Sequence, residues 1–409
     1  MTSNRLILCS HLVALVSSFA LSSVALSSVA LVLSFSRSRA RSFLFPTTIQ
    51  QSPMAEIENI VSYVPKYYQN LPTSVWSRLP STRRSAVFIL LFLGKMGELR
   101  VILTKRSSQL RNFPGHISLP GGKADSEAET EWQVSRREME EEIGISADNE
   151  KLKKNFGFSI DHLKVLPCYL SRTFLAVRPC VGFMKFGNDV LESELIHNLT
   201  LTLNPGESSG IFSCPLRDFL HPTVDEEPSE SIERQSHSVH WGSIPWNLRS
   251  YIFPQKKLNE PTWLHDIQDL LEEDYSDEDE IAKREQTPPT SDSSEKASKK
   301  QKLSLWGRLG SRRDSETQER IYDVWGLTAN ILHDLAKITY GHAGGIQGEE
   351  ELIYSVWHHG NQMRQKERSP EEAKLINATI SDNYGFLDIL PRQEFLRLKK
   401  LYRGGDVKM

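Results

Sequence analysis

The chain has 409 residues, of which 25% are charged and 39% hydrophobic, and its formal net charge is −3. This balance is typical of a soluble globular protein with one large domain or two small ones. A net charge this close to zero argues against a protein that binds nucleic acid over its whole surface. We therefore expect a folded domain that has no nucleic-acid partner.

The first 53 residues differ from the rest. Residues 12–35 carry no charge and are long enough to cross a bilayer. Three arginines follow between residues 37 and 41, and the positive-inside rule would then keep the downstream domain in the cytosol. We interpret residues 1–53 as a targeting or anchor segment, either a membrane anchor or a cleaved leader, and residues 54–84 as an N-terminal extension.

Apolar runs separated by turn residues predict a series of strands from residue 85 onward. A helix is expected over residues 130–143, because Gly144 stands where a glycine commonly ends a helix. Residues 85–258 would form the first part of one domain. The predicted strands cover residues 85–94, 98–107, 116–120, 162–171 and 173–186, and a strand leading into a short helix covers 210–222.

The second half of the chain changes in composition. Residues 259–319 are first acidic, then rich in Ser, Thr and Pro, and finally basic, which predicts a disordered insertion. Apolar residues at helical spacing then predict a closing helix over residues 320–341. Residues 342–409 are expected to form a helical C-terminal tail of two or three helices without a chemical motif.

Four of the five glutamates in the predicted helix at residues 130–143 lie within residues 138–142. Each helical residue turns by about 100°, so Glu138, Glu141 and Glu142 lie at about 0°, 300° and 40° on one face. Glu140 lies at about 200°, on the opposite side. Carboxylates on one face repel one another unless a cation lies between them. Because Mg²⁺ prefers oxygen ligands, this face predicts metal-assisted chemistry on a phosphate, and the alternative is a solvated surface helix.

The same stretch resembles the Nudix box, whose usual form is G-x5-E-x7-R-E-U-x-E-E-x-G-U, with U apolar. Glu129 matches the first glutamate of the box, because seven residues separate it from Arg137. One spacing departs, since six residues rather than five lie between Gly122 and Glu129. The other matching positions are Arg137, Glu138, Met139, Glu141, Glu142, Gly144 and Ile145.

The longer loop is similar to that of the Nudix branch that hydrolyses coenzyme A. That branch also carries an upstream signature close to LLTKRS-x-x-LR-x-x-x-G-x-x-x-FPGG, and here residues 102–122 read ILTKRSSQLRNFPGHISLPGG. Leu119 and Asn112 depart from the usual Phe and His. The likeness is closest to fungal peroxisomal members and covers about residues 85–341 without the insertion. The matching positions are Thr104, Lys105, Arg106, Ser107, Leu110, Arg111, Gly115, Pro120, Gly121 and Gly122.

The resemblance implies an α/β/α sandwich with a mixed sheet, and a diphosphatase that needs Mg²⁺, with Mn²⁺ as a possible substitute. The implied reaction is attack of water on the diphosphate of coenzyme A, which yields 4'-phosphopantetheine and adenosine 3',5'-bisphosphate. The residues carried over are Glu138, Glu141 and Glu142 for the metal, Glu141, Glu142 and Arg137 for catalysis, and Arg106, Arg111, Gly121 and Gly122 for the substrate.

Four residues outside the carboxylate face also have expected roles. Arg137 is spaced to fold back onto the preceding loop, with Glu129 as its partner. Arg106 and Arg111 present planar guanidinium groups suited to phosphate, and their alternative role is salt bridging at the rim of the core. His116 lies on a predicted strand, where a structural role is the expected one.

Two other functions remain open. One is Nudix chemistry on another nucleoside diphosphate derivative, such as an oxidised nucleoside triphosphate. The other is a non-catalytic, membrane-anchored binding module, which the complete set of glutamates argues against. The resemblance implies a peroxisomal location, and the apolar residues 12–35 leave a membrane-anchored protein with a cytosolic domain, or a mitochondrial one, as alternatives.

Overall fold

The computed structural model describes most of the chain after residue 52. Residues 1–52, which include the apolar segment 12–35, lie outside the described residues, as does Arg111. Among the helices that are described, none combines the length and apolar composition needed to cross a membrane. The described ranges are 53–110, 112–187, 199, 201–204, 206–220, 229–257, 259–264, 311–314, 317–378 and 384–403.

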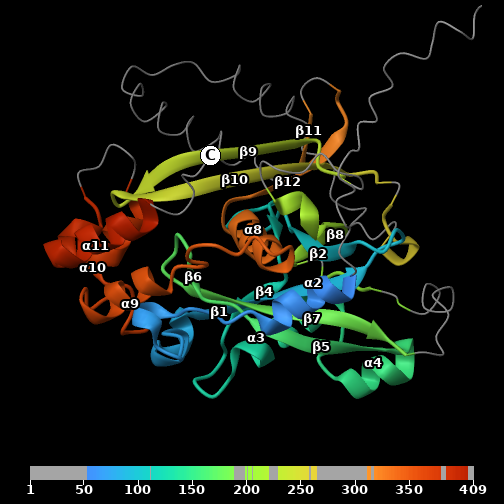
Figure 1. Ribbon diagram of the computed structural model, residues 1–409, viewed down its shortest axis with the longest axis horizontal. Coiled ribbons are helices and arrows are strands. Elements are labelled where there is room, and N and C mark those ends of the chain that lie inside the picture. Colours follow the sequence, from blue (N-terminus) through green and yellow to red (C-terminus); the bar gives the residue numbers. More distant parts are fainter. Residues whose placement is uncertain are drawn as a thin grey trace, which may run out of the picture. The chain divides into compact units, whose positions relative to one another are not determined.

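A mixed eight-stranded sheet lies at the centre of the domain (Figure 1). Strand β1 pairs in parallel with β7 and antiparallel with β2 and β4, so the mixed sheet expected from the sequence is confirmed. The short β4 occupies the start of the stretch predicted as loop. The strands are β1 Arg84–Leu93, β2 Leu99–Arg106, β3 Ile117–Ser118, β4 Gly121–Lys123, β5 Phe158–Val165, β6 Tyr169–Leu170, β7 Ala176–Phe186 and β8 Ser208–Pro215.

Helices cover both faces of this sheet. Successive side chains of a strand point to opposite faces, and in β1 both sets are apolar and buried. Phe88 and Leu90 pack in one cluster with Met139 of helix α3 (Glu131–Ile143). Leu91 packs in the other cluster with residues of α2 (Pro53–Ser62) and α8 (Gly326–Thr339). The expected α/β/α sandwich is therefore present, and α4 (Asn149–Phe156) leads into β5.

A second, four-stranded sheet was not predicted. Its order is β11-β12-β10-β9, from β9 (Glu233–Trp241), β10 (Ile244–Pro254), β11 (Ser311–Arg313) and β12 (Arg320–Trp325). Helical spacing predicts one helix over residues 320–341. The first part of this prediction is wrong, because residues 320–325 form β12, which pairs with the long strand β10. Only the part from Gly326 onward is helical.

The predicted insertion also has ordered ends. Within residues 259–319, η5 (Thr262–Leu264) places Trp263 against Phe92 with ring centroids 5.2 Å apart, and β11 pairs with β12. Both ends therefore belong to the folded domain, because each buries apolar surface or completes backbone hydrogen bonds there. Residues 265–310 lie outside the described residues.

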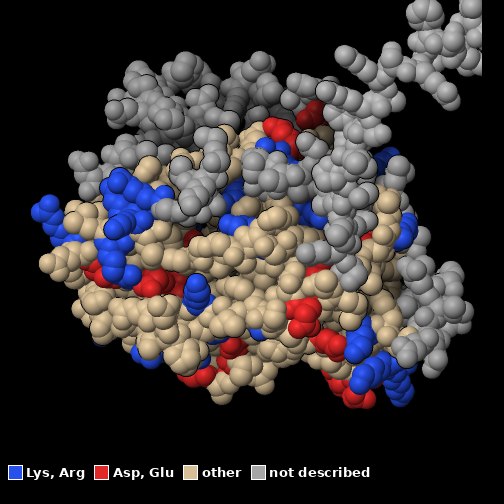
Figure 2. Space-filling view, viewed as in Figure 1, with Lys and Arg blue, Asp and Glu red and all other residues tan. Residues whose placement is uncertain are grey.

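The C-terminal region packs on the N-terminal extension. Helices α9 (Glu350–His358), α10 (Pro370–Asn377) and α11 (Arg392–Arg403), with the short η6 (Phe386–Asp388), share an apolar cluster with η1 (Tyr68–Asn70) and η2 (Trp76–Arg78). Lysine and arginine side chains mark the exposed side of α11 (Figure 2). The described part of the predicted tail thus contains three helices that are integral to the fold.

Candidate active site

Helix α3 begins and ends at defined residues, which fixes the direction of its glutamates. Thr130 caps the helix: the Gln133 backbone amide donates to Thr130 Oγ1 at 3.3 Å, and the Gln133 side chain accepts from the Thr130 amide at 2.9 Å. Gly144 ends the helix with φ of 76°, and its amide donates to the Glu140 carbonyl. The predicted helix and its terminal glycine are both confirmed.

The two glycines before the helix bring backbone against its carboxylates. A Cβ atom on Gly122 would lie 2.3 Å from the carboxylate carbon of Glu138, and one on Gly121 would lie 2.4 Å from the Ala86 carbonyl oxygen. No side chain fits at either position. The Gly121 amide donates to Glu142 Oε1 at 3.4 Å. The glycine turn therefore shapes the site by allowing this close approach.

The three predicted metal ligands share one face but lie at different depths. The Glu142 side chain is buried, that of Glu138 is 16% exposed and that of Glu141 is 49% exposed. Burial raises the pKa of the Glu142 carboxyl to about 8; the Gly121 amide and Arg106 oppose this shift, and Glu138 adds to it. Burial also raises the pKa of Glu138, against the effect of Arg137.

Arg137 binds the loop to the helix, as the spacing predicts. Its Nε donates to Glu129 Oε1 at 2.9 Å, and its Nη2 donates to the Lys123 carbonyl at 2.9 Å. Its Nη1 donates to Glu138 at 2.9 Å and to Glu141 at 3.2 Å. Glu129 also accepts from a backbone amide of the same loop. The residue thus positions the loop and two of the carboxylates at once.

Glu140, which the helical spacing places on the opposite side, is exposed and accepts from Ser146 Oγ and the Ala147 amide beyond the helix. It takes no part in the carboxylate face. This separates Glu140, which binds the loop after the helix, from Glu138 and Glu142, which lie against the glycine turn.

Arg106 and His116 lie beside the carboxylate face. Arg106 ends β2, and its charge acts on both Glu142 and His116. Its Nε is buried without a hydrogen-bond partner among the described residues. His116 is buried and accepts at Nδ1 from Trp325 Nε1 at 3.2 Å, which agrees with the expected structural role. Burial, together with Arg106, lowers the pKa of His116 to about 4.

Comparison with known proteins places this site in a family. The NUDIX domain model matches residues 82–235. The peroxisomal coenzyme A diphosphatase 1 of Saccharomyces cerevisiae is 39% identical over 357 residues, which cover 82% of this chain and 92% of that protein. The chain belongs to the Nudix hydrolase family. Its box residues are therefore those of a hydrolase acting on phosphorus-containing anhydrides.

Two other relatives match a shorter part of this Nudix hydrolase. Nudix hydrolase 15 of Arabidopsis thaliana, described as mitochondrial, is 37% identical over 37% of this chain and 46% of that protein. The mouse peroxisomal coenzyme A diphosphatase NUDT7 is 31% identical over 36% of this chain and 53% of that protein. These matches cover about half of each relative.

Sequence reasoning missed one carboxylate of the Nudix site. Glu207 lies in the turn before β8, and its charge raises the pKa of both Glu138 and Glu142. The Ser107 amide donates to its carbonyl oxygen at 2.9 Å. Its proximity depends on the pairing of β8 with β2, where Arg106 lies opposite Ser208. An acid just before an apolar strand is only a weak signal in sequence.

The donor set fits a hard divalent cation. Glu138 and Glu142 offer carboxylate oxygens, and the charge of Glu207 acts on both of them. A bound cation would stabilise the ionised form of such buried carboxylates, whose pKa values are raised. Among the described residues no three carboxylate, imidazole or thiol groups already converge as a metal site. Arg137 Nη1 donates to Glu138 and Glu141, so binding of a cation there requires these side chains to rearrange.

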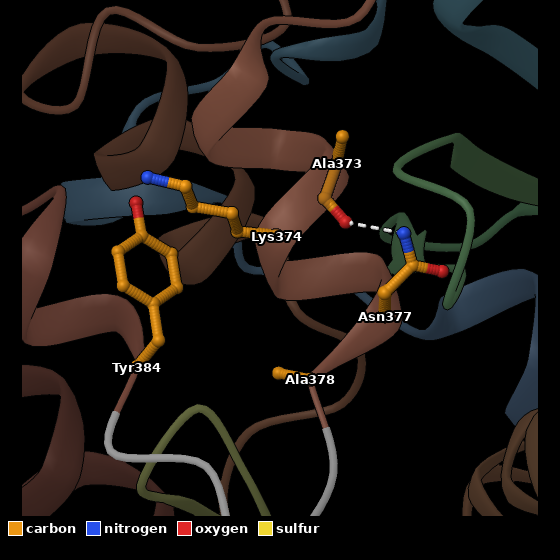
Figure 3. A pocket seen from close by; sticks show the side chains of 5 residues that line it. All are labelled: Ala373, Lys374, Asn377, Ala378 and Tyr384. Carbon is orange, nitrogen blue, oxygen red and sulfur yellow. Dashed lines mark hydrogen bonds between the residues drawn. The ribbon is translucent and has the colours of Figure 1, made fainter.

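Two cavities elsewhere contain none of the box residues. One, of about 480 Å³, lies on α10 between Lys374, Asn377 and Tyr384, where Asn377 donates to the Ala373 carbonyl (Figure 3). The other, of about 240 Å³, lies between β10, α8 and α11 and includes Asp334, Glu349 and Tyr402. The second cavity does place Asp334 next to Gly348, whose amide donates to it at 3.3 Å, but neither cavity contains a residue of the box, so the chemistry is assigned to α3.

Proposed function

We propose that this Nudix hydrolase cleaves the diphosphate of coenzyme A or its derivatives to 4'-phosphopantetheine and adenosine 3',5'-bisphosphate, with Mg²⁺ as the cofactor. The observation that carries the proposal is the match to the yeast coenzyme A diphosphatase, which extends over 92% of that protein. The mouse relative bears the same activity in its name. The site supports the proposal because its carboxylates, glycine turn and Arg106 suit a diphosphate.

The reaction consumes one water molecule. The water oxygen bonds to one phosphorus atom, the bond from that phosphorus to the bridging oxygen breaks, and the bridging oxygen leaves with the other phosphate. One water proton must be accepted near the attacking oxygen. When bound, Mg²⁺ supplies charge neutralisation at the diphosphate and lowers the pKa of a bound water.

The residues of the chain then have separate roles. Glu138 and Glu142 would hold Mg²⁺, because their carboxylates lie against the glycine turn. Glu141 is the most exposed of the three and would serve as a further ligand or as the group that accepts the proton. Arg137 fixes the positions of the loop and of the carboxylates. Arg106 would pair with a phosphate through its guanidinium. Arg111 is proposed for the same role and lies outside the described residues.

Mass spectrometry of the full-length protein with coenzyme A tests this proposal directly. Both products are expected in equal amounts in the presence of Mg²⁺, no product after chelation with EDTA, and recovery on adding Mg²⁺ or Mn²⁺. Oxidised nucleoside triphosphates and dinucleotides serve as competing substrates. Turnover of these nucleotides while coenzyme A stays intact would refute the proposal and support the alternative Nudix activity.

We also propose a peroxisomal location, which rests on the printed names of the yeast and mouse relatives. A fluorescent fusion of the full chain in cells with a peroxisomal marker tests this. Signal in mitochondria, for which the Arabidopsis relative gives a precedent, or at a membrane would contradict it.

A further inference from the structure

The loop between β2 and β3 carries an aromatic side chain that the proposed chemistry leaves unused. Phe113 has an exposed fraction of 49%, although phenylalanine is usually buried. Its backbone has φ of 52°, in the left-handed region that residues with a side chain seldom adopt. The residue therefore combines two unfavourable features, an exposed apolar ring and an unfavourable backbone conformation.

Two other large apolar residues show how such a backbone is usually offset. Phe174 has φ of 58° and Met363 also has φ of 58°, and both side chains are buried at 1% exposure or less. Their packing compensates for the conformation. In the described part of the chain, Phe113 is the one exposed large apolar residue with a positive φ, so packing offers it no comparable compensation. Unfavourable backbone conformations that packing does not explain are found preferentially at ligand sites.

The loop that carries Phe113 closes on Arg106. The Arg106 amide donates to the His116 carbonyl at 2.9 Å and the Gly115 amide donates to the Arg106 carbonyl at 3.2 Å, so the loop closes on Arg106. The ring of Phe113 meets that of His116 edge to face, with centroids 5.4 Å apart and an interplanar angle of 63°. His116 in turn lies 5.3 Å from the Trp325 ring. The pair His116 and Trp325 thus supports Phe113 from one side.

The neighbouring charge indicates what this ring would contact. Arg106, which acts electrostatically on Glu142, has a buried Nε without a partner among the described residues. A guanidinium that can pair with phosphate beside an open aromatic face is the combination that binds a nucleotide, with the base stacked and the phosphate paired. Phe113 lies on the loop between β2 and β3, whereas the carboxylates lie on α3.

We propose that Phe113 is a specificity-determining residue, whose ring stacks on the adenine of the substrate while Arg106 pairs with its phosphates. This inference rests on the proposed function, because it assigns the adenosine end of coenzyme A to the side of the site formed by the β2–β3 loop.

Binding of adenosine 3',5'-bisphosphate, measured by calorimetry on the full-length protein with Mg²⁺, tests the proposal without depending on turnover. Replacing Phe113→Ala is expected to weaken this binding about tenfold, because stacking of one base on an aromatic ring contributes on that scale. Binding of inorganic diphosphate, which has no base, should change less than twofold. Phe113→Tyr keeps the ring and should restore binding of the bisphosphate.

Phe186→Ala is the matched control, because Phe186 is also an exposed phenylalanine, at 37%, and ends β7 away from the loop. Unchanged bisphosphate binding by Phe113→Ala overturns the proposal, and so does an equal loss for bisphosphate and diphosphate, which would indicate a distorted loop. With coenzyme A as substrate, Phe113→Ala should raise KM about tenfold and leave kcat within about twofold. Failure of the wild-type protein to hydrolyse coenzyme A refutes the proposed function alone, since the calorimetric comparison still decides the role of Phe113.

Discussion

Buried glutamates occur in two regions of this molecule, and their surroundings differ. In the C-terminal region, Glu350 accepts from Ser74 Oγ at 2.5 Å and from the amides of Val75 and Cys168 at 3.0 Å. In α3, Glu142 accepts one long bond of 3.4 Å from the Gly121 amide. Both side chains are almost fully buried. The protein supplies Glu350 with three donors at short distances, whereas the Gly121 amide is a distant donor to Glu142.

The contrast extends to their neighbours. Glu372 in the C-terminal region forms an ion pair of 2.8 Å with the buried Arg83 and accepts from the Met363 amide. Burial and acidic neighbours raise the pKa of Glu138 in α3, and Arg137, which pairs with it, is shared among several acceptors. A buried carboxylate without sufficient donors is costly to the fold. The difference indicates that Glu350 and Glu372 stabilise the structure, and it agrees with the role in cation binding proposed for Glu138 and Glu142.

The largest effect is expected at Glu142, where a substitution should lower activity without lowering stability. Glu142→Gln should lower kcat by roughly 10²- to 10³-fold, because it removes a charge that acts on the reacting phosphate through the cation. The thermal midpoint should stay the same or rise, since a buried, poorly paired carboxyl is removed. Steady-state kinetics and circular dichroism melts measure the two quantities. Glu140→Gln, on the exposed side of the same helix, is the control, and a large loss of stability in Glu142→Gln would contradict the comparison.

The opposite pattern is expected at Glu350. Glu350→Gln should lower the free energy of unfolding by roughly 3 kcal/mol, because three donors lose a charged acceptor in a buried position. The kcat per folded molecule should be unchanged. Urea denaturation followed by fluorescence measures the effect, with the exposed Glu367→Gln as control. Equal stability of the two variants would show that the donors around Glu350 find other partners.

A smaller effect is expected at Arg137, which connects loop and carboxylates. Arg137→Lys keeps the charge but cannot contact Glu129, Glu138 and the Lys123 carbonyl together. We expect a loss of roughly tenfold in activity, as for other residues that orient metal ligands. A titration of activity against Mg²⁺ should show a higher half-saturating concentration. Arg392→Lys on α11 should behave like the wild type, and an unaltered Mg²⁺ dependence in Arg137→Lys would remove its positioning role.

The smallest change, taken per pH unit, concerns Glu349. Burial raises the pKa of this carboxyl to about 8 from an ordinary value of 4.5. Between these values the folded protein keeps a proton that the unfolded chain releases, so stability is greatest below the lower value and falls as the pH rises through about 8. The slope is at most about 1.4 kcal/mol per pH unit. Glu349→Gln should lack this slope in melts from pH 5 to 9, and parallel pH profiles for the two proteins would contradict the assignment.

The sequence alone predicts the local parts of the site because their geometry follows from short spacings. Thr130 and Gly144 mark the ends of α3, and the contact of Arg137 with Glu129 follows from their separation within one loop and helix. The glycine turn is predictable for the same reason. These features need no information from distant parts of the chain.

Other parts depend on distant partners and could not be predicted. Glu207 approaches the site because β8 pairs with β2, a register that no local pattern specifies. In β12, Ile321 and Val324 suit helical spacing as well as a strand, and pairing with β10 decides between them. Strand β9 is mostly exposed and polar, so it lacks the alternation of apolar residues by which strands are recognised.

The bond between Ser74 and Glu350 joins positions 276 residues apart in the chain. During synthesis, the segment around Ser74 leaves the ribosome long before its carboxylate partner, at about 5–20 residues per second. It must wait tens of seconds, at these rates, before Glu350 is available. The N-terminal extension therefore gains its final contacts only late in synthesis, and a chain that is cut short before α9 would leave the donors around Ser74 without their acceptor.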